Sequence, residues 1–325
     1  MYALSRRHAL ALGSTALLLP STLRAQAVWP SGPVTLIVGY AAGGGTDINA
    51  RELAHIMSPL ISQQVIVDNK GGASGSLGVR VVASAKPDGQ TLFYATATNV
   101  IINPHVQKGM IDTLSSLSAI CQTTSYQYVL AVNPKVAASN AAELVALAKK
   151  EPEKLTYSSS GVGGNNHLAG ALFADAAGIK ITHVPYKGTG PALADVISGQ
   201  ITMNFSSLPP AVGQIKAGNL KALAVTGEKR IKSLPDVPTL KEQGIDVVVN
   251  GWHGIFAPAK TPDALLDKIE KEAKQAMKDP KWKEALSKDG LEMPPELTRA
   301  QFAKFVADEH AFWGKKLKDL KIDME

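Results

Sequence analysis

The sequence predicts an α/β protein, because short runs of β-forming residues alternate with amphipathic helical segments along most of the chain. Its 325 residues correspond to about two domains of roughly 150 residues each. A composition of 45% hydrophobic and 19% charged residues is that of a globular chain and excludes a disordered one. We therefore expect mostly parallel sheets covered by helices.

The predicted strands are short and mostly apolar. The first covers residues 34–40 (VTLIVGY), a nearly continuous apolar run that is typical of a strand buried on both faces. Further β-rich runs lie along the chain at 65–67, 91–96, 128–132, 155–158, 181–184, 201–205 and 220–225.

The segments between these predicted strands show the periodicity of amphipathic helices. Residues 47–60 place Ile48, Leu53, Ile56 and Leu60 on one side, as a helix packed against a sheet requires. Ser139 is expected to cap a later helix.

After Trp252 the chain is expected to become helical and charged, with helices at 262–278, 282–288 and 299–317. The lysines of these helices should form a solvated face. Their buried stripe would consist of Leu265, Ile269, Phe302, Phe305 and Trp313.

The N-terminus has the pattern of an export signal. Arg6-Arg7 precedes the apolar run 9–19, and residues 25–27 (AQA) supply the small side chains that a signal peptidase requires. The run is too short to span a ~30 Å hydrocarbon core. We expect residues 1–27 to be a signal peptide, cleaved near Ala25 or Ala27, which sends the protein to the periplasm. The arginine pair fits a twin-arginine signal as well as a plain Sec signal.

Charge and cysteine usage exclude several classes. Removal of the signal takes away three arginines and lowers the formal charge from +6 to +3, too little to favour nucleic acid as a partner. Cys121 is the single cysteine, so an intrachain disulfide and a thiolate zinc cluster are excluded, and we expect its side chain to be buried.

Two glycine-rich loops are the candidate binding elements. The first, residues 43–47 (GGGTD), lies between a strand and a helix, where free N–H groups and the helix dipole favour an anion. The second, residues 158–167 (SSSGVGGNNH), has the same setting in the other half of the chain. Two such loops suggest two lobes that aim helix N-termini at one cleft, although each could be only a capped turn. A third cluster, 71–75, is interpreted mainly as a turn.

Catalytic and metal motifs are missing from the sequence. No serine lies in a G-x-S-x-G elbow, and the histidines show neither H-E-x-x-H nor another metal-ligand spacing. No carboxylate pair stands out for acid–base work. We expect no cofactor, no metal and no catalytic residue, with a secreted hydrolase using Ser160 and His167 as the alternative.

A series of short motifs spans essentially the whole mature chain, at 38–47 (VGYAAGGGTD), 67–72 (VDNKGG), 86–89 (KPDG), 157–161 (YSSSG), 167–170 (HLAG), 183–188 (HVPYKG), 218–226 (GNLKALAVT) and 234–239 (LPDVPT). As an ordered set, these motifs resemble the extracytoplasmic solute receptors of tripartite tricarboxylate transporters, the Bug or TctC family.

The resemblance implies a type II periplasmic-binding-protein fold, with two α/β lobes joined by two crossovers. One lobe would comprise residues 28–125 and 252–325, and the other residues 126–251. The two glycine loops would then face each other across the cleft, holding a ligand carboxylate by backbone amides and ordered water. The expected ligand contacts are Tyr40, Ala42, Gly43, Asp47, Thr98, Ser160, Gly164, Asn166, Ser206 and Trp252.

Two further expectations concern individual residues. We expect Asp47 to act more as a helix cap than as a ligand contact, because its carboxylate would repel an anion. The family often has Asp-Asn where this chain has Ser206-Ser207, so a relative's ligand preference should not be transferred directly.

The resemblance also implies a role. The chain would be a monomeric, non-enzymatic receptor that captures a small organic carboxylate, aromatic or dicarboxylic, for separate membrane transporter subunits. A sensor that presents its ligand-bound form to a membrane signalling protein is the alternative within the binding class.

Overall fold

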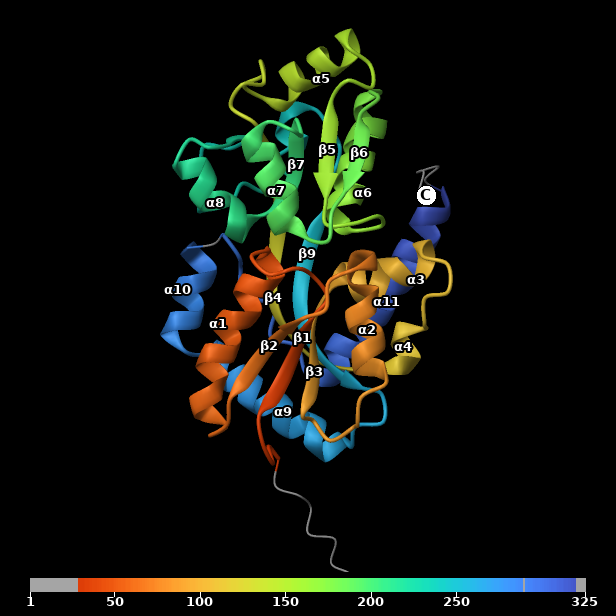
Figure 1. The fold of residues 1–325 in the computed structure, drawn as a ribbon, viewed down its shortest axis with the longest axis vertical. Helices are drawn as coiled ribbons and strands as arrows, with labels where there is room; N and C mark the ends of the chain where they lie inside the picture. The colour runs from red at the N-terminus through yellow and green to blue at the C-terminus, as the bar shows by residue number, and fades with distance from the viewer. Residues whose placement is uncertain (1–28, 289, 320–325) are drawn as a thin grey trace, which may run out of the picture.

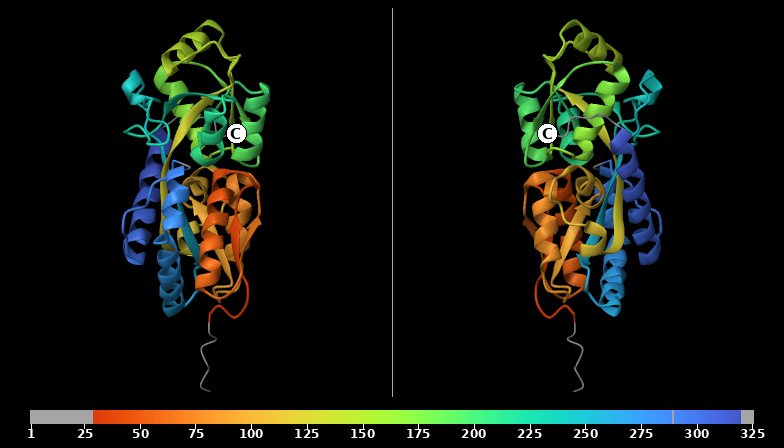
Figure 2. Two further views of the ribbon diagram at one scale, coloured as in Figure 1. Left: turned by 90° about the vertical axis from the view of Figure 1, so that its left-hand side faces the viewer. Right: turned by 90° about the vertical axis from the view of Figure 1, so that its right-hand side faces the viewer.

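The structure is a computed structural model that describes residues 29–288 and 290–319. Two halves lie one above the other along the long axis of the molecule (Figures 1 and 2). The signal peptide expected at residues 1–27 lies outside the described residues. In the described part of the chain, no helix is long and apolar enough to cross a membrane.

A nine-stranded sheet passes through both halves in the order β2-β1-β3-β9-β4-β7-β5-β6, with β8 paired to β4. The lower half in Figure 1 contains β1 Val34–Val38, β2 Val65–Asn69 and β3 Thr91–Thr96. The upper half contains β5 Thr156–Ser159, β6 Thr182–Pro185, β7 Met203–Ser207 and β8 Lys221–Val225. The two remaining strands are β4 Leu117–Val132 and β9 Asn250–Pro258.

β4 connects the two halves. It pairs antiparallel with β9 from Leu117 to Gln127, and with β7 from Tyr128 to Val132. Strands β1–β3 and β5–β7 pair in parallel among themselves, whereas every pairing of β4 and β9 is antiparallel. The α/β class is therefore confirmed, but the sheet is mixed rather than mostly parallel.

Two strand predictions were incomplete. The strand expected at 128–132 is only the end of β4, because the earlier part is rich in Gln, Thr and Ser and its pairing with β9 shifts register. β9 was missed altogether, and the segment directly after Trp252 is a strand, not a helix. Most of β9 is buried, so it shows no alternation of polar and apolar residues from which a strand could be predicted.

Helices cover the sheet in both halves (Figure 1). The lower half has α1 Gly45–Leu60, α2 Ser76–Ala83, α9 Asp263–Met277, α10 Pro280–Lys288 and α11 Arg299–Asp319. Shorter helical turns there are η1 Ala73–Gly75, η2 Thr98–Ile102, α3 Asn103–Val106 and α4 Thr113–Ser116. The upper half has α5 Ala141–Lys150, α6 Asn165–Ala177, α7 Thr189–Ser198, α8 Leu208–Lys216 and η3 Lys241–Gln243.

The cap predicted for α5 was wrong by one residue. Asn140, not Ser139, is the N-cap, and its side-chain oxygen accepts a hydrogen bond of 2.8 Å from the Glu143 N–H. Ser139 instead donates its own N–H to the Glu143 carboxylate. Glu143 therefore accepts from the residue before the N-cap, which differs from a capping box, where it would accept from the N-cap N–H itself.

The apolar core agrees with most of the predicted stripe. Ile269 and Phe302 are fully buried, whereas Leu265, Phe305 and Trp313 are half-buried. Cys121 is buried as expected, and burial raises the pKa of its thiol to about 12.

We expect Phe302→Ala to lower the free energy of unfolding by about 3–5 kcal/mol, the usual effect of removing a buried aromatic ring. The Phe302 ring lies 5.6 Å, centroid to centroid, from the rings of both Trp252 and Phe256. Phe312→Ala is the matched control, because this side chain is 56% exposed, and it should change stability by less than about 0.5 kcal/mol. Urea denaturation measures both, and equal effects would contradict the assigned core.

Candidate functional site

A small polar cavity lies between the two halves, where the N-terminal ends of several helices meet. Gly44 and Ser207 are the N-caps of α1 and α8, while Asn165 and Thr189 begin α6 and α7. The residues that line the cavity are Tyr40, Gly44, Gly45, Thr46, Thr98, Tyr126, Tyr128, Ser160, Asn165, Asn166, Thr189 and Ser207. None of these described lining residues carries a charged side chain.

This arrangement suits an anion. The first N–H groups of a helix have no partner within the helix, and the helix dipole adds partial positive charge at the same end. α1 belongs to the lower half, whereas α6, α7 and α8 belong to the upper half (Figure 1). Donors from both halves therefore surround one small volume.

The two halves are closed on each other. The cavity has a volume of about 20 Å³, room for about one water molecule and far below the ~300–1,000 Å³ of ordinary ligand pockets. The Ala41 N–H donates to the Lys187 carbonyl over 3.1 Å. A Cβ atom on Gly188 would lie only 3.1 Å from the same Ala41 nitrogen, so glycine permits this approach.

A second contact between the halves involves Thr98 and Asn165. The Thr98 hydroxyl donates to Asn165 Oδ1 over 3.1 Å and accepts from the Asn165 N–H over 3.0 Å. Thr98 begins η2 and Asn165 begins α6, so this pair joins the start of a helical segment in each half. Ser74 also reaches across, donating its hydroxyl to the Val162 carbonyl.

Tyr40 supplies a neutral phenol to the cavity. Its hydroxyl forms hydrogen bonds with Thr96 Oγ1 at 3.2 Å and Asn99 Nδ2 at 3.0 Å. Burial raises the pKa of this phenol, and hydrogen bonds only partly offset the rise. Tyr40 therefore stays protonated and uncharged at neutral pH.

Asp47 is committed to the first loop rather than to the cavity. Its carboxylate accepts from the Gly43 N–H at 2.9 Å and from Asn69 Nδ2 at 3.0 Å, and it pairs with Arg51 at 2.9 Å. Burial alone would raise the pKa of this carboxyl, but the bonds from Arg51, Gly43 and Asn69 outweigh it and hold the pKa below 3.8. The negative charge thus organises the loop and is compensated there.

Asn166 organises the second loop. Its Oδ1 accepts from the Ser160 hydroxyl at 3.0 Å and the His167 N–H at 3.1 Å. With its oxygen occupied, the donors of the side-chain amide remain for a further partner. Gly164 precedes it as the N-cap of α6, and a Cβ atom there would lie 2.9 Å from Asn166 Oδ1.

The structure brings some of the expected ligand residues together and not others. Tyr40, Thr98, Ser160 and Asn166 line the cavity. Those that lie outside its lining are Ala42, Gly43, Asp47, Gly164, Ser206 and Trp252.

Ser206 and Trp252 were among the expected ligand contacts, and each faces elsewhere for a physical reason. Successive residues of a strand point to opposite faces, so Ser207 reaches the cavity and Ser206 does not. The Ser206 hydroxyl donates to the Ser207 carbonyl at 2.8 Å. Trp252 packs against Phe256 and Phe302 and lines a separate hollow of about 560 Å³.

Several lining residues were not expected from the sequence. Tyr126 and Tyr128 lie two positions apart on β4, which places both on one face, and this spacing is a signal that could have been used. Thr189 follows Gly188 at the start of α7, the same pattern as the first loop. Thr46 and Asn165 lie within the loops that the sequence singled out.

The geometry does not support the hydrolase alternative. A serine hydrolase would need His167 to take the Ser160 proton, but Ser160 donates to Asn166 and His167 Nδ1 accepts from the Gly163 N–H. Among the described residues, no group of three or more His, Cys, Asp or Glu side chains is placed to hold a metal.

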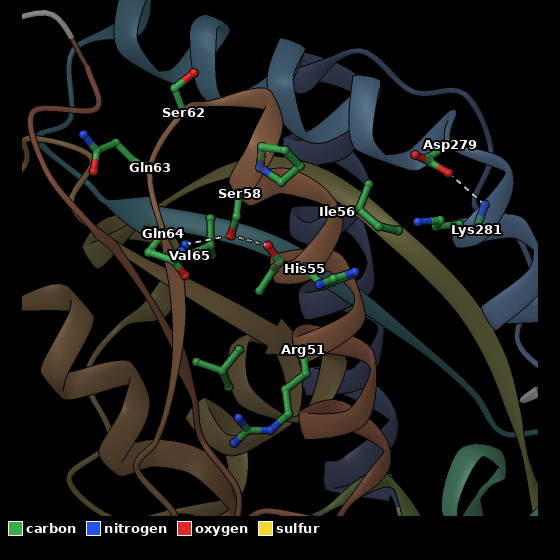
Figure 3. Close-up of a pocket in the computed structure, with 13 residues that line it drawn as sticks. Arg51, His55, Ile56, Ser58, Ser62, Gln63, Gln64, Val65, Asp279 and Lys281 are labelled. Atoms are coloured by element: carbon green, nitrogen blue, oxygen red, sulfur yellow. Dashed lines mark hydrogen bonds between the residues drawn. The ribbon is translucent and has the colours of Figure 1, made fainter.

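A wider surface hollow of about 840 Å³ lies away from the cavity, between the end of α1, the start of β2 and α10 (Figure 3). Arg51, His55 and Lys281 are among the residues that line it. The described lining residues all belong to the lower half, so this hollow lacks donors from the upper half and is a weaker candidate.

Comparison with known proteins identifies relatives over nearly the whole chain. The family model described as "Tripartite tricarboxylate transporter family receptor" matches residues 49–322. A protein of Agrobacterium vitis, named for the TAR-I ttuE-ttuC' intergenic region, is 41% identical over 270 residues, covering 82% of this chain and 77% of the relative.

Solved structures show the same two-lobed fold. The periplasmic binding protein BugD is 32% identical, with a TM-score of 0.87, and the match covers 90% of this chain and 98% of BugD. MatC from Rhodopseudomonas palustris with bound malate is 26% identical, with a TM-score of 0.84 and coverage of 88% and 99%. Rpa4515 of R. palustris with adipate is 29% identical, with a TM-score of 0.86 and coverage of 89% and 97%.

We expect Asp47→Ala to lower the free energy of unfolding at pH 7 by about 1.5–3 kcal/mol, because it removes a buried, hydrogen-bonded carboxylate. The folded-state pKa is lowered, so the stabilisation is complete above pH 3.8 and is lost as the pH falls through the folded value. The difference between variant and unmodified protein should therefore shrink below pH 3.8.

Asp68→Ala is the control for this prediction, because Asp68 forms a partly exposed ion pair with Lys70. It should cost less than about 1 kcal/mol. Denaturation curves across pH measure both variants, and an unchanged stability of Asp47→Ala with an altered ligand profile would show that Asp47 acts on the ligand instead.

Proposed function

The chain belongs to the tripartite tricarboxylate transporter receptor family, and from that premise we propose that its interlobe cavity binds a small organic carboxylate. It is a periplasmic solute-binding protein and not an enzyme. Relatives of the same fold carry malate and adipate, which supports a carboxylate as the ligand class.

The single observation that carries this proposal is the meeting of helix N-termini from both halves at a cavity without a charged side chain. A cation-lined pocket would attract any anion, whereas main-chain donors at fixed positions select for the shape of a carboxylate. We propose Tyr40, Thr98, Ser160 and Asn166 as ligand contacts.

Hydrogen bonds alone are not enough for tight binding. A micromolar complex corresponds to about −8 kcal/mol, and a hydrogen bond to an ionised group contributes roughly 1.5–3 kcal/mol. Because association itself costs several kcal/mol, apolar burial of the ligand body must contribute. Tyr126 and Tyr128 offer that surface, and burial raises the pKa of both phenols, so they remain uncharged.

Ligand entry requires the halves to separate. A cavity of about 20 Å³ has no room for a dicarboxylate, so the Thr98–Asn165 and Ala41–Lys187 contacts must open. We propose lobes of residues 28–125 with 252–325, and of residues 126–251. Bending of β4 and β9 between them would then admit the ligand.

The finer parts of the role are also proposals. We propose that the ligand-bound receptor, acting as a monomer, delivers its cargo to separate membrane subunits of a tripartite transporter. Export would follow cleavage of the signal peptide near Ala25 or Ala27.

Calorimetry with a defined panel tests the ligand class. Purified protein would be titrated with malate, adipate, benzoate and, as a neutral control, glucose. We expect micromolar binding of at least one carboxylate and none of glucose. Tight binding of glucose with no heat from any carboxylate would refute the proposal.

Asn166→Ala should weaken binding of that carboxylate about tenfold or more, because it removes an uncharged donor and loosens the second loop. Asn219→Ala is the matched control, since Asn219 is exposed just beyond the C-terminal end of α8 and its side chain donates a hydrogen bond to Gln214. The affinity of the Asn219→Ala variant for the carboxylate should stay within about twofold of that of the unmodified protein. Equal affinities of the two variants in calorimetry would remove Asn166 from the site.

A further inference from the structure

A buried histidine lies directly behind the cavity without lining it. His253 is 1% exposed and belongs to β9. Its ring is held between two tyrosines, with centroid distances of 5.2 Å to Tyr94 and 4.7 Å to Tyr126. Tyr126 itself lines the cavity.

Both ring nitrogens of His253 have threonine partners. Nδ1 lies 2.8 Å from Thr124 Oγ1, on the neighbouring strand β4. Nε2 lies 3.3 Å from Thr46 Oγ1, at the second position of α1. Thr46 lines the cavity, so the imidazole connects a residue of the sheet to a residue of the candidate site.

The positions of the protons follow from the partners of Thr124. The Thr124 side chain is fully buried, and among the described residues its hydroxyl has one hydrogen-bond partner, His253 Nδ1. A buried hydroxyl without an acceptor is costly, so Thr124 donates its proton to Nδ1. Nδ1 is then an acceptor, and the neutral ring carries its hydrogen on Nε2.

This tautomer determines which role the Thr46 hydroxyl takes in its hydrogen bond with His253. An Nε2–H group donates to Thr46 Oγ1, so the threonine oxygen is occupied as an acceptor and its own hydrogen is not used by the imidazole. With the opposite tautomer, Nε2 would instead take that hydrogen, and Thr46 would face the cavity as an acceptor.

We propose that His253 is a positioning residue for anion recognition, which directs the Thr46 hydroxyl proton toward a bound carboxylate. This inference rests on the proposed function of the cavity. In this way Thr46 adds a hydroxyl donor to the main-chain N–H groups at the helix N-termini, a condition that favours an ionised carboxylate over the corresponding amide.

The ionisation of His253 is compatible with this role. Burial lowers the pKa of its imidazole to about 3, so the ring is neutral at ordinary pH. The titratable groups that face it are the phenols of Tyr94 and Tyr126, and burial raises the pKa of both. The tautomer is therefore set by Thr124 and not by a charged neighbour.

Nuclear magnetic resonance of ¹⁵N-histidine-labelled, ligand-free protein reads the tautomer directly. The His253 signal would be assigned by its loss in His253→Phe. We expect the Nε2–H tautomer, unchanged between pH 5 and pH 8. A proton on Nδ1, or titration within that range, would overturn the proposal. Because no ligand is needed, this result is independent of the proposed function.

A double-mutant cycle measures the coupling between His253 and Thr46. Binding of adipate and malate is measured by calorimetry. Thr46→Val should weaken binding about tenfold or more, and Thr46→Ser, which keeps the hydroxyl, should stay within about twofold. His253→Phe keeps a ring between the tyrosines and should weaken binding about threefold to tenfold. His253→Gln, which retains an N–H donor, should recover most of that loss.

The decisive comparison is His253→Phe in the Thr46→Val background, where we expect no further loss because the histidine acts through that threonine. The same fold-loss in both backgrounds would show a merely structural role and overturn the proposal. If neither probe binds the unmodified protein, the carboxylate assignment loses its support, while the tautomer measurement still decides the role of His253.

Discussion

A protein that binds an anion without a cationic side chain depends on the N–H groups at the starts of helices, which have no partner within the helix. In this protein, α1 from one half and α6, α7 and α8 from the other begin at the same small cavity. No single half provides the whole set of donors, so the proposed recognition of a ligand at this cavity requires both halves to close on it. The glycines at the contact surface, such as Gly188, follow from this constraint because the backbones must approach closely.

The same constraint explains where the charged and titratable groups lie. Asp47 is next to the site, yet its charge is satisfied by Arg51, Gly43 and Asn69 within the lower half. His253 lies behind the site and is kept neutral by burial. Hydroxyl groups of tyrosine, threonine and serine and two asparagine amides, not ionised side chains, form the polar part of the described cavity lining. The electrostatic preference for an anion is thereby left to the main chain.

Sequence reasoning reached the parts of this design that are local. Both glycine loops were identified because strand, turn and helix start follow one another in the chain, whereas Thr98, Ser160 and Asn166, which line the cavity, were named from the family resemblance. The strand β9 escaped because burial removes the alternation that identifies a strand. Ser207 was confused with Ser206 because a one-residue error in a strand exchanges its two faces. The pairing of Thr98 with Asn165 joins distant segments, and no local pattern encodes it.

A crystal structure of the protein with its carboxylate bound tests the central claim most directly. The account predicts that the carboxylate oxygens lie about 2.7–3.2 Å from main-chain N–H groups at the start of α1 and from donors at the start of α6 or α7. No lysine or arginine nitrogen should lie within ion-pair distance of them. A ligand that is paired with a basic side chain, or that touches only one half of the molecule, would contradict the account.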